Sequence, residues 1–340
     1  MTARLWSDVE VGEELPELRF PLTLKTLVMA AMGTRDLMPY HHDDQFVRSI
    51  GMRGAFVNTM FHQGLFGRFA TDWAGPTARF RSASLRMTDQ LVAGDVAVVS
   101  GTVVDRWTAD DGDALVRLEL RTSNDLGTTA ISRTVLALPT VAGEHAGFRA
   151  LGEPEPTVLS DAMPTEAREQ IGVTSPRPGP YPVSEAQIGY FAEAVRDANP
   201  LYTDPGYADA SPAGGIIAPP PSLIVWVMDR GSQVGIDLDR PDIHLPEQPP
   251  WPVPAHKRAS LRLLPGMTDV VVQEVLLEFG VPLRPGDRVT SVNELVNCSG
   301  AKQTRVGPGH FLTARDTFVN QRDEAVGRST MTLLQFRAQA

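Results

Sequence analysis

The sequence predicts an α+β fold written twice along the chain, each copy a curved antiparallel sheet wrapped around a long central helix. Three observations predict it. A segment around Asp36 recurs 161 positions later around Asp197. In each copy a helical pattern precedes the aspartate and strand patterns follow it. A Gly-Asp turn, at Gly94 and again at Gly286, stands before the first of those strands.

Each copy opens with a helix. Thr23 and Ser184 are hydroxyl residues at the N-cap position, and Gln187 completes a capping-box pattern with Ser184. Apolar residues then recur at helical spacing until a proline-containing turn ends the pattern. We therefore expect one helix to end near Asp36 and another near Asp197.

A buried helix and several strands are expected after each aspartate. In the first copy the stretch 55–73 is apolar on most sides, which predicts a buried central helix. Strand patterns cover 96–104, 115–122 and 131–138 in the first copy, and 289–296, 311–320 and 329–336 in the second. The Gly-Pro-Gly-His sequence at 307–310 is most simply a turn.

The two copies define the expected domains. Residues 1–145 form the first, 181–340 form the second, and 146–180, which lack a sustained period, form a linker. The second copy is 31 residues longer between its aspartate and its Gly-Asp turn. Prolines concentrated in 241–254 mark this insert, which we expect to cover the second central helix and to shape a pocket.

Composition excludes some classes of protein. The 340 residues are 42% hydrophobic and 21% charged, as in ordinary globular proteins. No apolar run is long enough to span a membrane, and the lone Cys298 fits a reducing, cytoplasmic compartment. A net charge of −10 argues against a general nucleic-acid binder.

Asp36 and His41 are the residues best suited to proton chemistry. Asp36 lies at a helix end and His41 lies just past a turn containing Pro39, and a turn can bring side chains five apart to one point. Histidine has an ordinary pKa close to neutrality, as acid–base catalysis requires. The alternative is a structural histidine at a helix end. In the second copy Tyr202 replaces the histidine, which predicts that only the first copy is chemically competent.

The segment 36–43, Asp-Leu-Met-Pro-Tyr-His-His-Asp, resembles the hydratase signature of MaoC-like dehydratases and R-specific enoyl-CoA hydratases, Asp-x-Asn-Pro-Leu-His-x-Asp. Residues 197–205 carry the same signature with Tyr202 in place of histidine, and 214–219 is similar to the non-catalytic half of such proteins. These families have the hotdog fold. The resemblance therefore implies a double hotdog with its catalytic residues in the first half.

In such enzymes the aspartate and histidine activate one water. The resemblance implies that Asp36 and His41 direct it to C3 of a 2-enoyl thioester and exchange a proton with C2. Counting from His41, the family's His-Gly pair falls on Asn58 and Thr59, so the Thr59 backbone N–H is the expected oxyanion donor. Asn58 and His62 are the expected substrate-binding residues.

The sequence of the second half, and two differences of the first half from the family signature, bear on which half is catalytic. The same count in the second half falls on Pro219 and Pro220, which have no N–H to offer. In the first half Met38 replaces the signature asparagine, and Thr59 replaces a glycine. The second half is therefore expected to complete the cleft and the sheet without catalysing the reaction.

The expected function is the reversible hydration of a 2-enoyl-CoA to a 3-hydroxyacyl-CoA in lipid metabolism. The 307–310 stretch is also similar to one in partner subunits of hydratases for bulky, steroid-type acyl-CoA. One alternative is a dehydratase acting on acyl carrier protein thioesters, and another is a non-catalytic acyl-binding partner subunit. A hotdog thioesterase fits the Asp-to-His spacing less well. We expect no cofactor and leave a homodimer open. The adjacent residues 41–44 point apart, so no metal site is expected.

Overall fold

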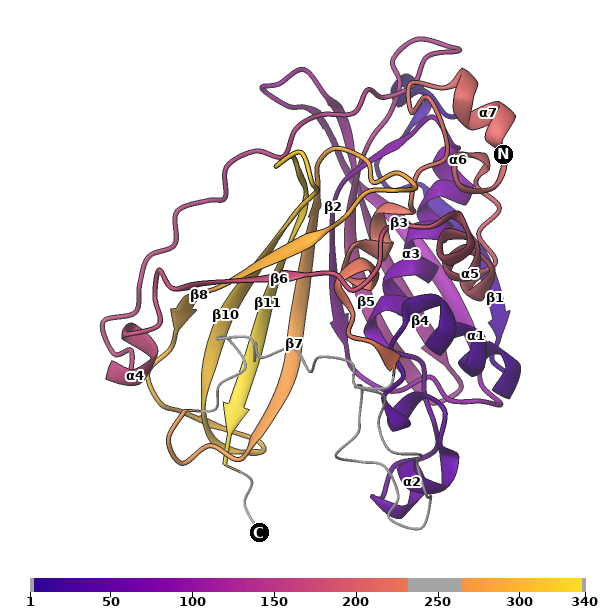
Figure 1. Ribbon diagram of the computed structural model, residues 1–340. Coiled ribbons are helices and arrows are strands. Elements are labelled where there is room, and N and C mark those ends of the chain that lie inside the picture. Colours follow the sequence, from indigo (N-terminus) through magenta and orange to yellow (C-terminus); the bar gives the residue numbers. More distant parts are fainter. Residues whose placement is uncertain (1–2, 232–263, 338–340) are drawn as a thin grey trace.

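The computed structural model describes residues 3–231 and 264–337, and in these ranges the chain forms one antiparallel sheet of eleven strands (Figure 1). The helices are η1 (Trp6–Asp8), α1 (Leu24–Thr34), η2 (Pro39–His41), α2 (Asp44–Ser49), α3 (Thr59–Ala74), α4 (Thr165–Arg168), α5 (Glu185–Val195), α6 (Pro200–Thr203), α7 (Pro205–Ala210) and η3 (Pro220–Val227). The strands are β1 (Glu14–Pro21), β2 (Arg79–Met87), β3 (Val96–Thr108), β4 (Ala114–Asn124), β5 (Gly127–Ala137), β6 (Thr174–Pro178), β7 (Asp269–Phe279), β8 (Thr290–Cys298), β9 (Lys302–Thr304), β10 (Gly307–Val319) and β11 (Ala325–Phe336).

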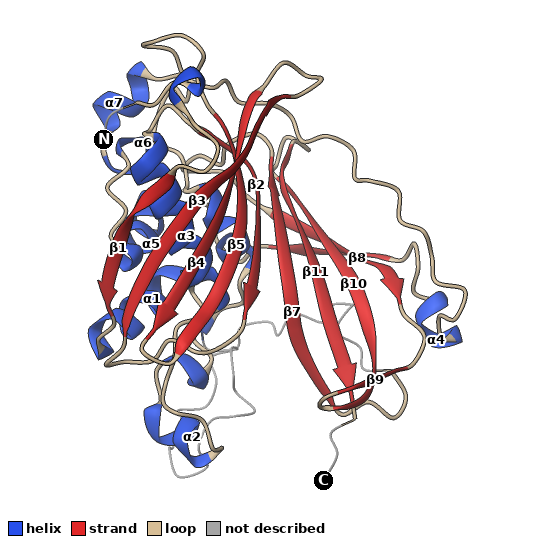
Figure 2. Cartoon of the chain, turned by 180° about the vertical axis from the view of Figure 1, so that it is seen from behind, coloured by secondary structure: helices blue, strands red, loops and turns tan. Residues whose placement is uncertain are grey.

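The strand order repeats across the middle of the sheet. It runs β1-β3-β4-β5-β2 and continues β7-β11-β10-β8-β6, while the short β9 pairs with β10. The halves join where β2 pairs with β7, with Ala83 opposite Leu277. Figure 2 shows the strands continuing from one half to the other, with α1, α3 and α5 together behind the first half. The predicted α+β class, with an antiparallel sheet in each half, is confirmed.

The two halves repeat individual hydrogen bonds as well as strands. Leu22 exchanges backbone hydrogen bonds with Gly94 and Asp95 at 2.8 and 2.9 Å. Val183 exchanges the same two bonds with the 286–287 turn, each at 2.8 Å. Both turn glycines have positive φ, 100° and 93°, a conformation that glycine adopts without steric cost. The backbone conformation of the two turns therefore explains why both have glycine at this position.

The predicted first helices are confirmed. The Thr23 side chain accepts from the Thr26 N–H at the start of α1, and the Ser184 side chain accepts from the Gln187 N–H at the start of α5. Each helix ends one residue before a left-handed arginine, and the aspartate follows that arginine. Local capping thus places both aspartates just past a helix C-terminus.

The predicted buried helix is α3, whose side chains are buried on most sides. It lies against β2 of the sheet and against α5 and η3 of the second half. A Cβ atom at Gly67 would lie 2.5 Å from Pro221 Cγ, which is shorter than any van der Waals contact. Glycine at 67 therefore lets α3 approach the second half this closely.

The second half departs from the expected form at its central helix. In the described residues, the segment that follows Pro219 is η3, a 3-10 helix of eight residues. Pro219 and Pro220 each precede another proline, and a residue before a proline is disfavoured in the α-helical region, so a regular α-helix is disfavoured at this start. The proline-rich insert at 241–254 lies outside the described residues.

Two further expectations need correction or comment. The turn expected at 307–310 is wrong, because these residues begin β10 and pair with β9 and β11. A Cβ at Gly309 would lie 2.4 Å from Gln335 O, so close strand packing explains this glycine. The expected linker, 146–180, contains α4 and β6, and β6 pairs with β8 at the sheet edge.

Within the described ranges, none of the helices combines the length and the apolar character needed to cross a lipid bilayer.

The β2–β7 junction makes a prediction about stability. Leu277 is 0% exposed and its neighbour Leu276 is 36% exposed, and both lie on β7 opposite β2. We expect Leu277→Ala to lower the free energy of unfolding by about 2–5 kcal/mol, because it leaves a cavity in the core. Leu276→Ala is the matched control and should cost clearly less. Urea unfolding of both variants measures this, and equal losses would contradict a buried junction.

Candidate functional site

The structure brings Asp36 and His41 together. Asp36 follows the left-handed Arg35 at the end of α1, and His41 lies in η2. His41 Nε2 is 3.3 Å from Asp36 Oδ2. The two side chains are 11% and 15% exposed, so the pair is largely withdrawn from solvent but remains accessible. A turn, as the spacing suggested, is what lets these side chains meet.

One hydrogen bond sets the protonation of the His41 ring. Nδ1 lies 2.8 Å from the Phe56 carbonyl oxygen, which only accepts hydrogen bonds. Nδ1 therefore carries a proton and donates it. In the neutral ring, Nε2 then has a free lone pair on the side that faces Asp36. The Asp36 carboxylate oxygen Oδ2 and the basic nitrogen Nε2 of His41 thus lie side by side, where one small molecule can contact both.

Asn58 connects the start of α3 to the end of α1. Its side-chain oxygen accepts from the Phe61 N–H at 2.8 Å and caps α3. Its amide nitrogen donates to Thr34 Oγ1 at 2.6 Å, and the Asp36 N–H lies 3.4 Å from the same oxygen. Both ends of the amide are engaged with the protein. Asn58 is therefore suited to positioning Asp36, more than to the substrate contact expected for it.

Thr59 is the first residue of α3. The N–H groups in the first turn of a helix have no acceptor within that helix, and the helix dipole favours negative charge there. The Thr59 side chain is directed to β2, with Oγ1 3.8 Å from Met87 Sδ. The Thr59 N–H therefore has no acceptor within α3, and its role as an anion-binding donor stays a prediction.

His62 is a buried residue of α3. Burial lowers the pKa of His62 to about 4, so its ring is neutral at physiological pH. The substrate contact expected for His62 stays a prediction, and the alternative is a packed, neutral ring in a core helix.

The residues after His41 have structural partners of their own. Asp43 caps α2 by accepting from the Phe46 N–H, and Asp44 pairs with Arg48 at 2.6 Å. Among residues 3–231 and 264–337, no three His, Cys, Asp or Glu side chains gather in a way that would hold a metal ion.

The corresponding residues of the second half are more deeply buried. Burial raises the pKa of Asp197 to about 6, although its bond from the Asn199 N–H acts in the opposite direction. Burial, with the nearby Asp197 as a smaller cause, also raises the pKa of Tyr202 well above its ordinary value. Tyr202 therefore stays protonated and cannot act as a base near neutrality.

The turns after the two aspartates differ in the way that the signature predicts. The Asn199 side chain accepts from the Leu201 N–H at 3.0 Å and caps α6. Met38, at the equivalent place, provides no side-chain cap for η2. The first turn is instead tied down by the contact of His41 with Phe56.

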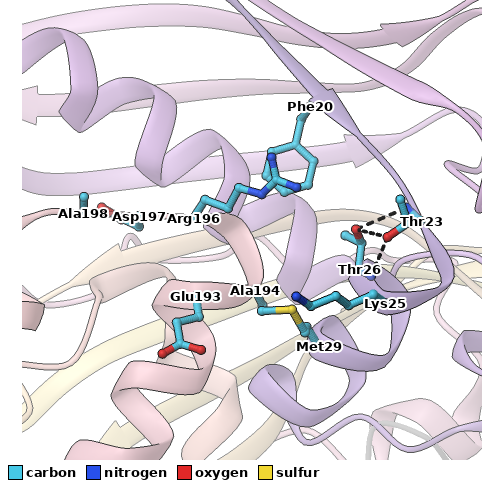
Figure 3. A pocket seen from close by; sticks show the side chains of 10 residues that line it. All are labelled: Phe20, Thr23, Lys25, Thr26, Met29, Glu193, Ala194, Arg196, Asp197 and Ala198. Atoms are coloured by element: carbon cyan, nitrogen blue, oxygen red, sulfur yellow. Dashed lines mark hydrogen bonds between the residues drawn. The ribbon is translucent and has the colours of Figure 1, made fainter.

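A pocket of about 390 Å³ lies between α1 and α5, beside Asp197 (Figure 3). Figure 3 shows Lys25 and Thr26 on one side of it and Glu193 and Arg196 on the other. Sequence reasoning did not predict this pocket. Both halves line it, through α1 and α5, and neither Asp36 nor His41 is among the lining residues.

Sequence reasoning also missed two arginines. Arg35 and Arg196 have φ of 58° and 56°, which only glycine adopts readily. The Arg35 guanidinium lies 4.8 Å from the centre of the Tyr181 ring, and Arg196 lies 4.7 Å from the centre of the Phe20 ring. Each arginine thus stacks on an aromatic ring of the other half.

Arg35 makes further contacts across the halves. Its guanidinium donates to the carbonyl oxygens of Val225 and Asp229, each at 3.3 Å. The residue immediately before Asp36 is therefore anchored to the second half. A signal for this was present in the sequence, because the Arg-Asp pair and the ring residue before the helix both recur at the same spacing.

Comparison with known proteins gives one family match and several relatives. Residues 169–251 match the family described as FAS1-like, dehydratase domain region. The chain is 32% identical over 162 residues to a probable enoyl-CoA hydratase alpha subunit of Thermomonospora curvata, spanning 48% of this chain and about half of that relative, 47%.

A second relative is matched over most of its length. The chain is 36% identical over 117 residues to the 3-oxo-4,17-pregnadiene-20-carboxyl-CoA hydratase beta subunit of Mycobacterium tuberculosis, covering 34% of this chain and 87% of that subunit. Among solved structures, a Mycobacterium tuberculosis protein with a double hotdog fold aligns with a TM-score of 0.62 at 14% identity, over 98% of this chain and 99% of that chain. The likeness to this structure shows the fold alone.

The burial of Asp197 makes a prediction about pH. With its pKa raised to about 6, the folded protein binds this proton more tightly than the unfolded chain, so stability falls as pH rises from about 4 to 6. We expect Asp197→Asn to raise the free energy of unfolding at pH 7.5 by up to about 3 kcal/mol, and by progressively less towards pH 4. Urea unfolding across this range measures it, with the exposed Asp125→Asn as control. If the gain in the free energy of unfolding is the same at every pH, the pKa of Asp197 is not raised by burial.

Proposed function

Because the chain belongs to the MaoC-like hydratase and dehydratase family, we propose that it is a hydro-lyase that adds water reversibly to a 2-enoyl-CoA and forms a 3-hydroxyacyl-CoA. The observation that carries the proposal is the Asp36–His41 pair, with 3.3 Å between a carboxylate oxygen and a ring nitrogen. The names of the relatives, which describe hydratase subunits, support the same reaction.

In the hydration direction, one water donates hydrogen bonds to both Asp36 Oδ2 and His41 Nε2, which are 3.3 Å apart. The pair accepts a proton from this water while its oxygen bonds to C3 of the enoyl group. The electrons of the double bond move toward the thioester, and C2 then takes up a proton from the pair. The hydroxyl group of the water is then bound to C3 and a proton to C2 of the substrate. The reaction therefore needs no cofactor, and the reverse sequence removes water.

Negative charge develops on the thioester oxygen during this reaction. A backbone N–H at the start of a helix stabilises such charge without reorganising. Thr59, at the first position of the sixteen-residue α3, offers this donor. Asn58 ties that helix start to Thr34 beside Asp36, so one network supports both the acid–base pair and the donor.

The second half serves the first without catalysing the reaction. Tyr202 remains protonated, and the prolines at 219–221 offer no N–H donor. The relatives are named as alpha or beta subunits, whereas in this chain β2 pairs with β7 within one polypeptide. We infer that the second half supplies in the same chain the wall that completes the cleft. A homodimer of the whole chain stays a prediction.

A second candidate is a dehydratase that acts on acyl carrier protein thioesters. The match of residues 169–251 to the FAS1-like dehydratase region favours it. Rates with crotonyl-CoA and with crotonyl-acyl carrier protein, compared at equal concentration, distinguish the two carriers. No turnover of either thioester would support the non-catalytic partner subunit.

The catalytic proposal predicts the rates of four variants. Asp36→Asn and His41→Ala should each lower kcat on crotonyl-CoA by about 10²–10⁴-fold, the range for a positioned acid–base group. The double variant should lose little more than the worse single variant, because the two residues act as one unit. Tyr202→Phe is the matched control in the second half and should leave kcat nearly unchanged. Loss of enoyl absorbance measures all four.

If Tyr202→Phe lowers kcat as much as His41→Ala, the catalytic residues lie in the other half. If the two losses at Asp36 and His41 multiply in the double variant, they do not share one water.

A further inference from the structure

Gln63 is a buried polar residue where α3 packs against the sheet. Its side chain is 6% exposed, and neither its oxygen nor its nitrogen has a hydrogen-bond partner among the described residues. A buried amide without partners lowers stability, so such a group usually has another reason to be present. Asn58, one turn earlier, is by contrast fully bonded.

A small cavity of about 10 Å³ lies beside Gln63, where α3 meets β2, β5 and η3. Its polar walls are Gln63, Ser84, Ser132 and Thr134, and the Ser132 and Thr134 hydroxyls are 3.1 Å apart. A space of this size holds about one water-sized group, provided that the group has polar partners. The cavity therefore has the volume and the chemistry for a single oxygen.

The cavity lies on the same interface as the expected oxyanion donor. Gln63 follows Thr59 by four residues, so both lie on one face of α3, about 6 Å apart along the helix axis. Thr59 contacts Met87 on β2, and Gln63 lies at Ser84 and Leu85 on the same strand. Met87, the β2 residue at Thr59, has a flexible, unbranched side chain that adapts its position. An acyl chain that extends from the Thr59 N–H along β2 by one helical turn would therefore reach Gln63.

We propose that Gln63 determines specificity by binding an oxygen at the far end of a short acyl chain. A carboxamide both donates and accepts, so it pairs with a hydroxyl or a carbonyl group. The substrate class is then a 2-enoyl thioester whose chain carries such an oxygen about one helical turn beyond the thioester. This inference rests on the proposed hydratase function and names the substrate that the same site prefers.

Two thioesters that differ by one group test the proposal. 6-Hydroxy-2-hexenoyl-CoA carries a hydroxyl where 2-heptenoyl-CoA carries a methyl group of similar size. We expect the wild-type protein to prefer the hydroxylated substrate by about tenfold in kcat/KM, the size of one hydrogen bond. Gln63→Leu should abolish this preference, and Thr134→Val should reduce it. The exposed Gln303→Leu is the control and should keep both the preference and the rate on crotonyl-CoA.

The outcomes separate this inference from the proposed function. Turnover of both substrates at equal efficiency, unchanged in Gln63→Leu, overturns the inference and leaves the hydratase function intact. No turnover of these substrates or of crotonyl-CoA overturns both. A raised Tm in Gln63→Leu with an unchanged preference would mean that Gln63 only holds a water, which also overturns it. Gln63→Met, an apolar residue of similar length, replaces Gln63→Leu if that variant does not fold.

Discussion

The close packing of α1 against α5 is the constraint on which the site depends. A Cβ atom at Gly33 would lie 2.6 Å from the Tyr190 carbonyl oxygen, so the two helices meet at a distance that only glycine permits. At the same contact the Gln187 side chain donates to the carbonyl oxygens of Met32 and Gly33, at 3.2 and 2.8 Å. Both are among the last carbonyls of α1, which lack the regular helical partner; Met32 O also accepts from the Arg35 N–H. The end of the first half's helix is therefore completed by the second half, immediately before the aspartate.

The position of Asp36 also depends on the second half through Arg35, the residue that precedes it. A non-glycine residue in the left-handed conformation costs roughly 1–2 kcal/mol. Arg35 offsets this cost through its stack on Tyr181 and its bonds to carbonyl groups at 225 and 229. Arg196 repeats the conformation and the stack on Phe20. The second half has Tyr202 in the position of His41, and its contacts with Arg35 hold the residue next to the first half's aspartate in place. This explains why the two halves share a backbone pattern and differ at single side chains.

The helix α3 combines three tasks along its length. Its first turn offers unpaired N–H groups, and Asn58 fastens that turn to the end of α1. Its middle carries Gln63 toward β2 and β5. Further along, Gly67 admits Pro221 of the second half. One buried helix thus connects the proposed oxyanion donor, the buried Gln63 amide and the contact between halves, so a shift of α3 would alter all three.

Sequence alone determined the features that rest on local geometry. The caps at Thr23 and Ser184, the helix ends and most of the strands follow from spacing and residue type, because their interactions join residues a few positions apart. The meeting of Asp36 with His41 belongs here too, since one short turn creates it. Tertiary structure decided the rest. Residues 307–310 became a strand because β9 and β11 were available to pair with them. The partners of Arg35 lie more than 140 residues away, and the isolation of Gln63 depends on which strands surround it. No local pattern encodes these contacts, because each depends on where distant segments come to lie.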